Sequence, residues 1–284
     1  MLVDSPSTEP LCACETFNRK RALVKTPGKQ SEEVPVIGVA SVFTPSKSRG
    51  KGYAGTMMRL LSERLKKETG SKGFSVLYSD VGPTFYDRNG GWKAHQATEV
   101  NIPATSTFSE EIVSMKLMTL EEAEECIKED ARLLKQEMDD LEISEVTAVQ
   151  LIPQNDELEW ATVRGRQSAQ ASPLKQSENV GARIVDEGKL GYITWVPDLS
   201  RRSLTVLRLR EPTSDAALKR LVSAALREAR DLGLEKVKIW CPSSRLLKLL
   251  DTKVVLRDEN LPCLLPLGTE ERIQWRNIEK LGWC

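Results

Sequence analysis

Histidine is almost absent from this sequence, which contains one, His95, among 284 residues. Histidine is the usual general base of nucleophilic triads and a common zinc ligand. Because no second histidine accompanies it, the sequence argues against a histidine-based triad and against a metal-dependent hydrolase. We expect His95 to have a structural or surface role.

The sequence also lacks an excess of charge of either sign and a long apolar stretch. Its 41 basic and 41 acidic residues give a formal net charge of zero, so the charge balance draws the chain neither to nucleic acid nor to an anionic membrane. It has no apolar run of about 18 residues, the length that a membrane-spanning helix needs, and its first residues are too polar for a signal peptide. These absences predict a cytoplasmic protein without a nucleic-acid or membrane partner, and they leave its oligomeric state open.

The cysteines show no metal-binding spacing. Cys12 and Cys14 lie two residues apart on a predicted strand, and therefore on one face of it, but no second pair follows. We expect small buried thiols in a reducing compartment and no metal site. The six cysteines are Cys12, Cys14, Cys126, Cys241, Cys263 and Cys284.

The most informative stretch is a strand, a basic glycine loop and a helix, all within residues 36–70. β-Branched and aromatic residues at positions 36, 39, 42 and 43 fit a buried strand. From Tyr53 onwards apolar residues recur every three or four positions, which predicts a helix that Gly70 ends. Gly50, Gly52 and Gly55 allow the loop to turn sharply and leave backbone N–H groups exposed. Because such amides and the helix dipole attract anions, the loop predicts a phosphate cradle. Positive charge beside it comes from Lys47, Arg49 and Lys51.

Two known glycine-loop motifs do not account for this loop. A P-loop ends in Gly-Lys-Ser or Gly-Lys-Thr, whereas Gly52 follows Gly50-Lys51 here. Residues 50–55 do match the Gly-x-Gly-x-x-Gly spacing of a dinucleotide site. That match is weak by itself, and no strand ending in an acidic residue follows at the required distance of about twenty residues.

The middle of the chain predicts helices. Thr119-x-x-Glu122 is a capping box that opens an amphipathic helix over residues 119–141. A second helix is predicted from near Asn155, and residues 164–180 are predicted to form a loop. We interpret the acids of the first helix as a solvated face with favourable charge in the first turn. These acids are Glu121, Glu122, Glu124, Glu125, Glu129 and Asp130.

The pattern Arg49-x-x-Gly52-x-Ala54 resembles the (Gln/Arg)-x-x-Gly-x-(Gly/Ala) signature of the GCN5-related N-acetyltransferase (GNAT) superfamily. Residues 74–78 fit the next buried strand, and residues 82–92 resemble the superfamily's short helix with its Gly-Trp ending. Residues 77–83 with Phe85-Tyr86 resemble more closely the lysine N6-acetyltransferases of fungal lysine catabolism. The end of the chain is similar to the same group at Trp275, Glu279, Lys280, Trp283 and Cys284. The core motifs lie within residues 10–95, and the resemblance beyond residue 110 is looser.

The resemblance implies an α/β (α+β) fold with a GNAT-type mixed sheet flanked by helices. Residues 1–107 are expected to form an acetyl-CoA-binding GNAT domain. Residues 108–284 are expected to form a second, degenerate GNAT-like domain that borders the acceptor site. The superfamily places a strand and two helices before its first hairpin, whereas ten residues precede Leu11 here, so we expect an N-terminally truncated first domain. In the second domain, strands at 190–195, 204–209 and 236–240 surround a helix capped by Ser214. This repeats the order of the first domain without a basic glycine loop, because residues 210–215 carry two acids.

The resemblance also implies direct transfer of acetyl from acetyl-CoA to a primary amine of a small molecule, without a metal. The first candidate for the acceptor is the N6-amine of free L-lysine. Tyr86 stands where the superfamily has the general acid that protonates the departing thiolate. The alternative interpretation is that Tyr86 only packs beneath the coenzyme. For the base, Asp80, Glu15, a water chain and the C-terminal carboxylate of Cys284 stay open. Residues expected to bind the cofactor are Val42, Phe43 and Thr44 for the pantetheine and Arg49, Gly50, Lys51, Gly52, Tyr53, Ala54 and Gly55 for the pyrophosphate.

Two alternatives to a lysine acetyltransferase stay open. The chain is either an N-acetyltransferase for a polyamine or a secondary metabolite, or a truncated protein that binds coenzyme A without turnover.

Overall fold

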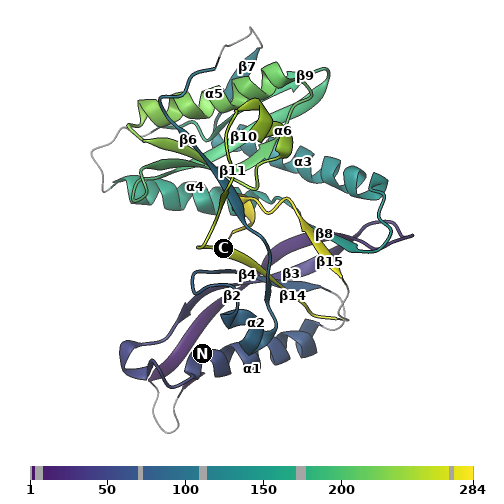
Figure 1. Cartoon of the computed structure of the whole chain (residues 1–284), viewed down its shortest axis with the longest axis vertical. Helices are drawn as coiled ribbons and strands as arrows, with labels where there is room; N and C mark the ends of the chain where they lie inside the picture. Colours follow the sequence, from purple (N-terminus) through teal and green to yellow (C-terminus); the bar gives the residue numbers. More distant parts are fainter. Residues whose placement is uncertain are drawn as a thin grey trace.

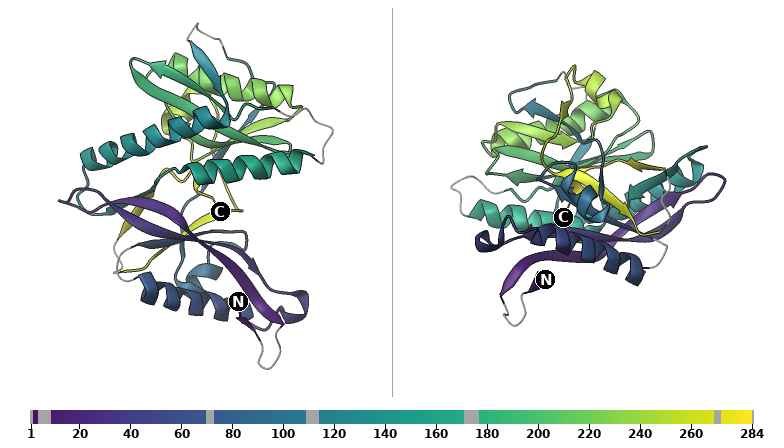
Figure 2. Two further views of the ribbon diagram at one scale, coloured as in Figure 1. Left: turned by 180° about the vertical axis from the view of Figure 1, so that it is seen from behind. Right: turned by 60° about the horizontal axis from the view of Figure 1, so that its bottom comes forward.

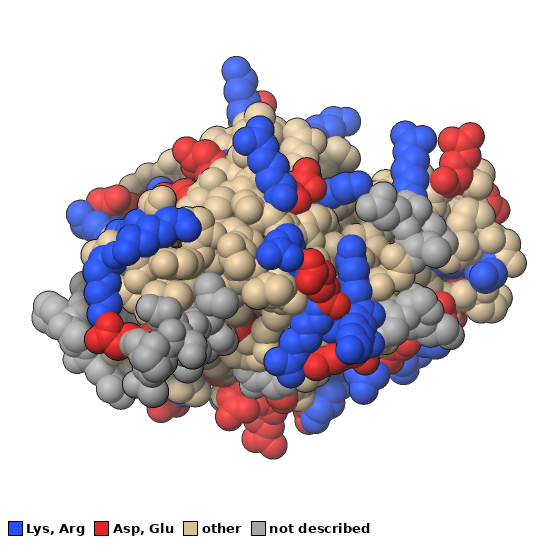
Figure 3. All heavy atoms as spheres, turned by 90° about the horizontal axis from the view of Figure 1, so that it is seen from below, with Lys and Arg blue, Asp and Glu red and all other residues tan. Residues whose placement is uncertain are grey.

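The computed structural model describes residues 2–3, 9–69, 73–108, 114–170, 177–268 and 272–283. The chain forms two lobes stacked along the long axis of the molecule, each built on one mixed β-sheet (Figure 1). Seen from below, basic and acidic side chains are interspersed over the surface, as the balanced composition leads one to expect (Figure 3).

The first sheet has eight strands in the order β15, β8, β2, β3, β4, β14, β5, with β1 paired to β2. The strands are β1 (Leu2–Val3), β2 (Pro10–Lys25), β3 (Glu32–Phe43), β4 (Phe74–Ser79), β5 (Lys93–Ala94), β8 (Thr147–Leu151), β14 (Leu261–Pro266) and β15 (Ile273–Arg276). Helices α1 (Tyr53–Thr69) and α2 (Phe85–Gly90) cover the outer face of this sheet (Figure 1). The predicted hairpin, the strand at 74–78 and the helix from Tyr53 are confirmed.

The second sheet has seven strands in the order β13, β6, β12, β11, β10, β9, β7. The strands are β6 (Thr98–Pro103), β7 (Met115–Met118), β9 (Gly181–Asp186), β10 (Lys189–Asp198), β11 (Ser203–Arg210), β12 (Lys236–Trp240) and β13 (Val255–Leu256). The remaining elements are α3 (Leu120–Asp140), α4 (Asn155–Gln170), α5 (Asp215–Asp231), α6 (Ser244–Leu249) and the 3-10 turns η1 (Ser46–Ser48) and η2 (Lys280–Gly282). Helices α3 and α4 lie between the two sheets, and α5 covers the outer face of the second (Figures 1 and 2).

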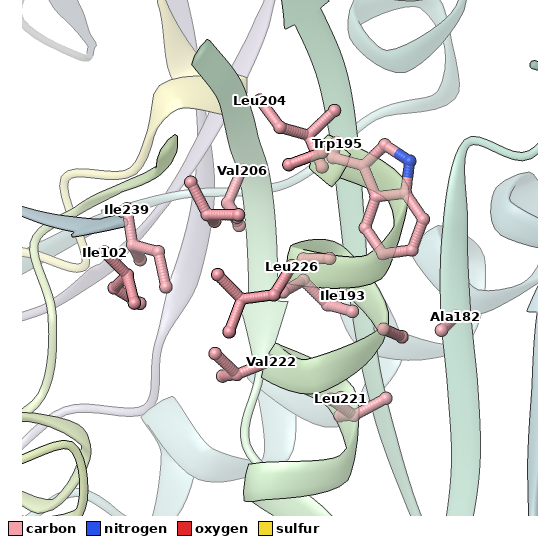
Figure 4. Close-up of a cluster of buried hydrophobic side chains, with 14 of the residues drawn as sticks. Ile102, Ala182, Ile193, Trp195, Leu204, Val206, Leu221, Val222, Leu226 and Ile239 are labelled. Carbon is pink, nitrogen blue, oxygen red and sulfur yellow. The ribbon is translucent and has the colours of Figure 1, made fainter. Parts of the chain in front are cut away.

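Helix α5 supplies the core of the second lobe. Its apolar residues recur at helical spacing, and Leu221, Val222 and Leu226 point at Ile193 and Val206 of the sheet (Figure 4). These side chains are almost fully buried, and burial of each stabilises the fold by about 1.5–3 kcal/mol. The predicted cap is confirmed, because the side chain of Ser214 accepts a hydrogen bond from the backbone N–H of Ala217.

The two sheets exchange strands across residue 107. β6 precedes that residue but pairs with β12 of the second sheet, through Ile102 and Val237. β14 comes from near the end of the chain but pairs with β4 of the first sheet, through Cys263 and Leu77. Because strands that far apart in sequence find each other only through tertiary packing, periodicity did not reveal the exchange. Whether residues 1–107 and 108–284 are separate domains stays a prediction.

The predicted loop at 164–180 is wrong for residues 164–170, which continue α4. Their Gln, Ser and Ala residues are acceptable in a helix. Gly165 does not end the helix, because it is where α4 packs closest to β10: a Cβ atom at this position would lie 2.2 Å from Cγ2 of Val196. Residues 171–176 lie outside the described part of the chain.

The predicted capping box of α3 is confirmed, but the solvated acidic face is wrong for Asp130, whose side chain is 0% exposed. Its carboxylate accepts hydrogen bonds from Tyr192 Oη (2.6 Å), Arg208 Nε (2.7 Å) and Arg210 Nη1 (2.6 Å). Burial raises the pKa of Asp130, but Arg208, Tyr192 and Arg210 together hold that pKa below its usual value. Sequence periodicity did not show this, because the partners come from strands 62 to 80 residues away.

The described cysteines are free thiols. Cys12, Cys126 and Cys263 are buried as predicted, whereas Cys241 is exposed. Among the described residues, no helix combines the length and the apolar content that a bilayer crossing requires.

Candidate functional site

Strands β3 and β4 separate at the end where the glycine loop begins. Their parallel pairing ends at Val39 and Leu77, although β3 continues to Phe43 and β4 to Ser79. Ser41 in this stretch has a left-handed φ of 53°, and the β2–β3 register shifts beside it. The β3 backbone beyond Val39 therefore has no β4 partner and can pair with an extended ligand, as strand edges do.

The loop needs glycine at different positions for different structural reasons. Gly50 and Gly52 have φ values of 74° and 79°, and a Cβ at either position would meet nothing within 4 Å. They are therefore required by the backbone turn and not by lack of space. Gly55 is a packing position, because a Cβ there would lie 2.4 Å from Oδ1 of Asn89 in α2.

The amides at the start of α1 are available to a ligand. Within the described part of the chain, the N–H groups of residues 50–55 donate to no protein acceptor. The first bond of the helix runs from the N–H of Thr56 to the carbonyl of Gly52 (3.0 Å), and the first turn of α1 contains no acidic residue. A helix N-terminus with bare amides is an anion-binding site.

Two of the three basic side chains of the loop are engaged with neighbouring groups. Arg49 is exposed, and its Nε donates to the carbonyl of Thr44 at 3.0 Å. Lys47 pairs with Glu9. Lys51 is exposed. The hydrogen bond of Arg49 ties the start of the loop to the end of β3.

Tyr86 lies in α2, next to the separated ends of β3 and β4. It is 8% exposed, and its ring meets Phe85 edge-on at 5.0 Å. Burial raises the pKa of Tyr86 to about 12, with further contributions from Cys263, Asp80 and two other thiols. The phenol therefore keeps its proton at neutral pH.

The structure brings five of the eleven predicted site residues together around Cys12. Val42, Tyr53, Ala54 and Tyr86 belong to the same apolar cluster as this thiol, and the hydroxyl of Thr44 donates to Cys12 Sγ at 3.2 Å. Phe43 points away, with 57% of its surface exposed. The binding and catalytic roles of these residues stay predictions.

The candidate bases are spread over different places. Asp80 follows β4, and its Oδ1 accepts a hydrogen bond from the N–H of Asn260 at 2.8 Å. Glu15 is exposed on β2, where it accepts from the hydroxyl of Ser41 at 2.8 Å. Cys284 lies outside the described residues. His95 contacts Trp275 edge-on at 5.5 Å, and burial lowers its pKa.

A cleft with a volume of about 380 Å³ lies between the lobes, and Asp80 lines it. This volume is within the range of small-molecule sites. The cleft is bordered by α4, the β10–β11 turn, β12 and η2. Its lining contains three acids and also a group of aromatic and basic side chains that includes Trp160, Arg164, Arg201, Trp240, Lys280 and Trp283.

Rings and cations alternate along the cleft. Lys280 Nζ lies 3.4 Å from the ring centroid of Trp283 and 4.4 Å from that of Trp240. The guanidinium carbon of Arg164 also lies 5.0 Å from the ring centroid of Trp283, and that of Arg257 lies 3.5 Å from the centroid of Trp240. Such contacts stabilise cations.

Sequence reasoning did not find this cleft. Lys280 and Trp283 entered the analysis only through the family resemblance, and Trp160, Trp240 and Arg164 were not singled out. A usable signal existed, because three of the six tryptophans of the chain line the cleft.

Comparison with known proteins supports the fold. A lysine acetyltransferase of Yarrowia lipolytica (strain CLIB 122 / E 150) is 33% identical over 97 residues, which cover 28% of this chain and 24% of that protein. A GCN5-related N-acetyltransferase from Kribbella flavida superposes with a TM-score of 0.57 at 16% identity, covering 90% of this chain and 57% of that one. A second, from Anabaena variabilis ATCC 29413, gives 0.55 at 16% identity, covering 88% and 59%.

The structural matches show the fold alone at this identity, and the predicted GNAT-type fold is confirmed. In each of these relatives the match covers less than two thirds of the relative's length. Residues 99–284 match the family model of the LYC1 GNAT-like C-terminal domain. Because that match includes more than half of the chain, the protein belongs to this GNAT-like family.

Proposed function

We propose that the protein is an acetyl-CoA-dependent N-acetyltransferase that acts on the primary amine of a small molecule. The N6-amine of free L-lysine is the first candidate, because the Yarrowia relative is named a lysine acetyltransferase. The observation that carries the proposal is the set of bare amides at the N-terminus of α1, beside the separated ends of β3 and β4.

The residues of the loop fit a pyrophosphate. The amides of residues 50–55 and the positive end of α1 would bind its oxygens. Arg49 and Lys51 would add charge from exposed positions. The left-handed φ values of Gly50 and Gly52 keep the loop in this conformation.

The end of β3 fits the pantetheine arm. Val42, Phe43 and Thr44 would pair with its amides as a neighbouring strand would, because β4 has separated there. When bound, acetyl-CoA supplies an activated acyl group as a thioester. One N–H of this stretch would donate to the thioester oxygen and stabilise the negative charge that develops on it.

Tyr86 would act on the sulfur of the leaving group. A free thiol has a pKa of about 8.5, well below the value of about 12 for Tyr86. In this environment the phenol would therefore stabilise the departing thiolate by donating a hydrogen bond, more than by transferring its proton completely.

Asp80 is the favoured base among the four alternatives. It lines the cleft in which a small amine would bind, and its negative charge reaches Tyr86, whose pKa it helps to raise. Glu15 instead lies exposed beside Ser41. The water chain and the C-terminal carboxylate remain alternatives to Asp80.

The experiment combines acetyl-CoA with a panel of amines, including L-lysine, polyamines and secondary-metabolite amines, and measures both free thiol and the acetylated product. A baseline without amine is needed, because Cys241 is exposed. We expect thiol release with at least one amine. If coenzyme A binds but no amine gives a product, the result would favour a protein that binds coenzyme A without turnover. If only polyamines give a product, it would favour a polyamine N-acetyltransferase.

The Tyr86→Phe variant tests the role of the phenol. We expect kcat to fall about 100-fold, within the usual range for loss of a positioned proton donor, with little change in coenzyme affinity. The measurement is steady-state kinetics together with calorimetric binding of coenzyme A. A fully active variant would leave Tyr86 as a packing residue.

A cytoplasmic location and the lack of a nucleic-acid or membrane partner are also part of the proposal. They are supported by the balanced charge of the chain and by the absence of a long apolar stretch from its sequence.

A further inference from the structure

Lys280 occupies an unusual position in the cleft between the lobes. It lies on η2, with its ammonium between the rings of Trp240 and Trp283. Its ammonium forms no hydrogen bond or ion pair with any residue in the described part of the chain. Lys280 is half-buried, and lysines that leave the solvent normally have a carboxylate partner.

The charged groups around Lys280 do not compensate it. Arg257, Arg164 and Arg201 are the nearest cations, and Asp198 is the acid that acts on it most directly. That acid also lies 3.9 Å from Arg201. The other charged groups that face the cleft, or adjoin it on η2, are Asp80, Glu157 with its partner Lys20, Lys238 with its partner Glu99, and Glu279 with its partner Arg208.

The result is an excess of positive charge at one end of a cavity that is large enough for a small molecule. Burial lowers the pKa of Lys280 to about 7, and Arg257 and Arg164 lower it further. Near neutral pH the amine is therefore only partly protonated. An anion placed against it would restore the proton, because opposite charge favours the charged form.

We propose that Lys280 anchors the carboxylate of the acceptor, so that the acceptor is an amino acid and not a polyamine. This inference rests on the proposed acetyltransferase function, and it assigns a specificity-determining residue to the acceptor side of that site. Trp240 and Trp283 hold the ammonium in place, and Arg164 extends the basic end of the cleft. Asp80 lies in the same cleft and faces the amine that is to be acetylated.

Binding of a carboxylate to Lys280 should be accompanied by proton uptake, which pairing with a permanently charged side chain would not show. Above pH 7 the carboxylate binds together with one proton, which comes from solvent and attaches to Nζ of Lys280. Affinity for an amino acid should therefore decrease as the pH rises from 7 to 8.5. A diamine without a carboxylate should bind with no such proton uptake.

The test is calorimetric titration of the full chain, saturated with coenzyme A, with L-lysine and with cadaverine, the same diamine without the carboxylate. Repeating the titration at pH 8.5 in buffers of different ionisation enthalpy gives the number of protons taken up. For L-lysine we expect close to one proton at pH 8.5 and close to none at pH 6. For cadaverine we expect none at either pH, with weaker binding.

Three variants make the test specific. Lys280→Met should weaken L-lysine binding about tenfold to a hundredfold, as expected when a charge-assisted hydrogen bond is lost, and should abolish proton uptake. Lys280→Arg should keep most of the affinity without proton uptake, because a guanidinium is always charged. Lys238→Met is the matched control in the same cleft, and it should change affinity less than twofold because Glu99 already neutralises Lys238. Thermal melting confirms that each variant is folded.

The outcomes separate this inference from the proposed function. In one outcome L-lysine binds with Lys280-dependent proton uptake, but no amine is acetylated. This would support the carboxylate site and contradict the proposed acetyltransferase activity. In another outcome L-lysine and cadaverine are bound and acetylated equally well, and Lys280→Met changes neither. This would support the acetyltransferase activity and contradict the carboxylate site. No binding of either amine, or proton uptake that persists in Lys280→Met, would also overturn it.

Discussion

The two lobes repeat one structural unit and use it differently. In the first, the β2–β3 hairpin is followed by α1 and the parallel strand β4; in the second, the β10–β11 hairpin is followed by α5 and the parallel strand β12. The strand-to-helix junction has nine residues (44–52) in the first unit and four (211–214) in the second. The topology is the same, so the difference in chemistry lies in the junction.

The second junction caps its helix with a side chain of the protein. The side chain of Ser214 caps α5, and its own N–H donates to Asp186 Oδ2 at 2.6 Å. Arg245 donates to the carbonyls of Pro212 (2.7 Å) and Thr213 (2.8 Å). Protein groups therefore already occupy the N–H groups of Ser214 and Ala217 at this helix end.

The charged residues of the two units follow the same division. Glu211 of the second junction and Asp215 at the start of α5 accept hydrogen bonds from Ser243 and Arg245, respectively. Arg208 of the same unit is buried against Asp130. In the first unit, Lys51 extends into solvent beside bare amides. The two copies of the fold thus differ in how many polar groups at the junction are left for a ligand, as the proposed coenzyme site in the first unit requires.

The largest effect is expected when the buried ion pairs of Asp130 with Arg208 and Arg210 are removed. Asp130→Ala should lower the free energy of unfolding by about 3–5 kcal/mol, because Arg208 and Arg210 lose their buried partner. Urea denaturation measures this. The matched control is Glu129→Ala on the same helix, which should leave the stability nearly unchanged because its ion pair with Arg132 is exposed to solvent. Equal losses in both variants would contradict the network's role.

The next effect tests the first junction. Gly52→Val places a β-branched residue at a φ of 79° and should weaken coenzyme A binding at least 100-fold, or about 2.7 kcal/mol. Gly188→Val is the control, since Gly188 has a φ of 76°, nothing within 4 Å of a Cβ, and a place in the other lobe. Calorimetric titration should find its affinity unchanged. If both variants bind normally, residues 50–55 do not hold the coenzyme.

The smallest effect concerns the cap of the second junction. Ser214→Ala should cost about 1 kcal/mol of stability, as loss of an N-cap usually does, and should leave coenzyme A affinity unchanged. Denaturation and titration of the same sample measure both. If the Ser214→Ala variant instead bound a second coenzyme A per chain, the cap alone would be what prevents binding at the start of α5.

Much of the fold was predictable because it is encoded locally. The hairpin, α1, β4, the α3 capping box and the α5 cap each depend on residues within a few positions of one another. The strand at residues 74–78 and the short helix that carries Tyr86 followed from motif spacing combined with the family resemblance.

The rest depends on residues that meet only in the folded protein. The transfer of β14 to the first sheet is invisible to periodicity, as is the burial of Asp130 by arginines 78 to 80 residues away. The cleft joins Asp80 of the first lobe to Trp160, Trp240 and Lys280. A lysine in a closing segment of mixed composition gives no sign that its ammonium lies against two indole rings.

The most direct test of the central claim is peptide-resolved hydrogen exchange with and without coenzyme A. Bound coenzyme should slow amide exchange in residues 50–55, because these N–H groups gain acceptors, and should leave residues 211–217 unchanged. Unchanged exchange at residues 50–55 under saturating coenzyme A, or equal protection of residues 211–217, would contradict it.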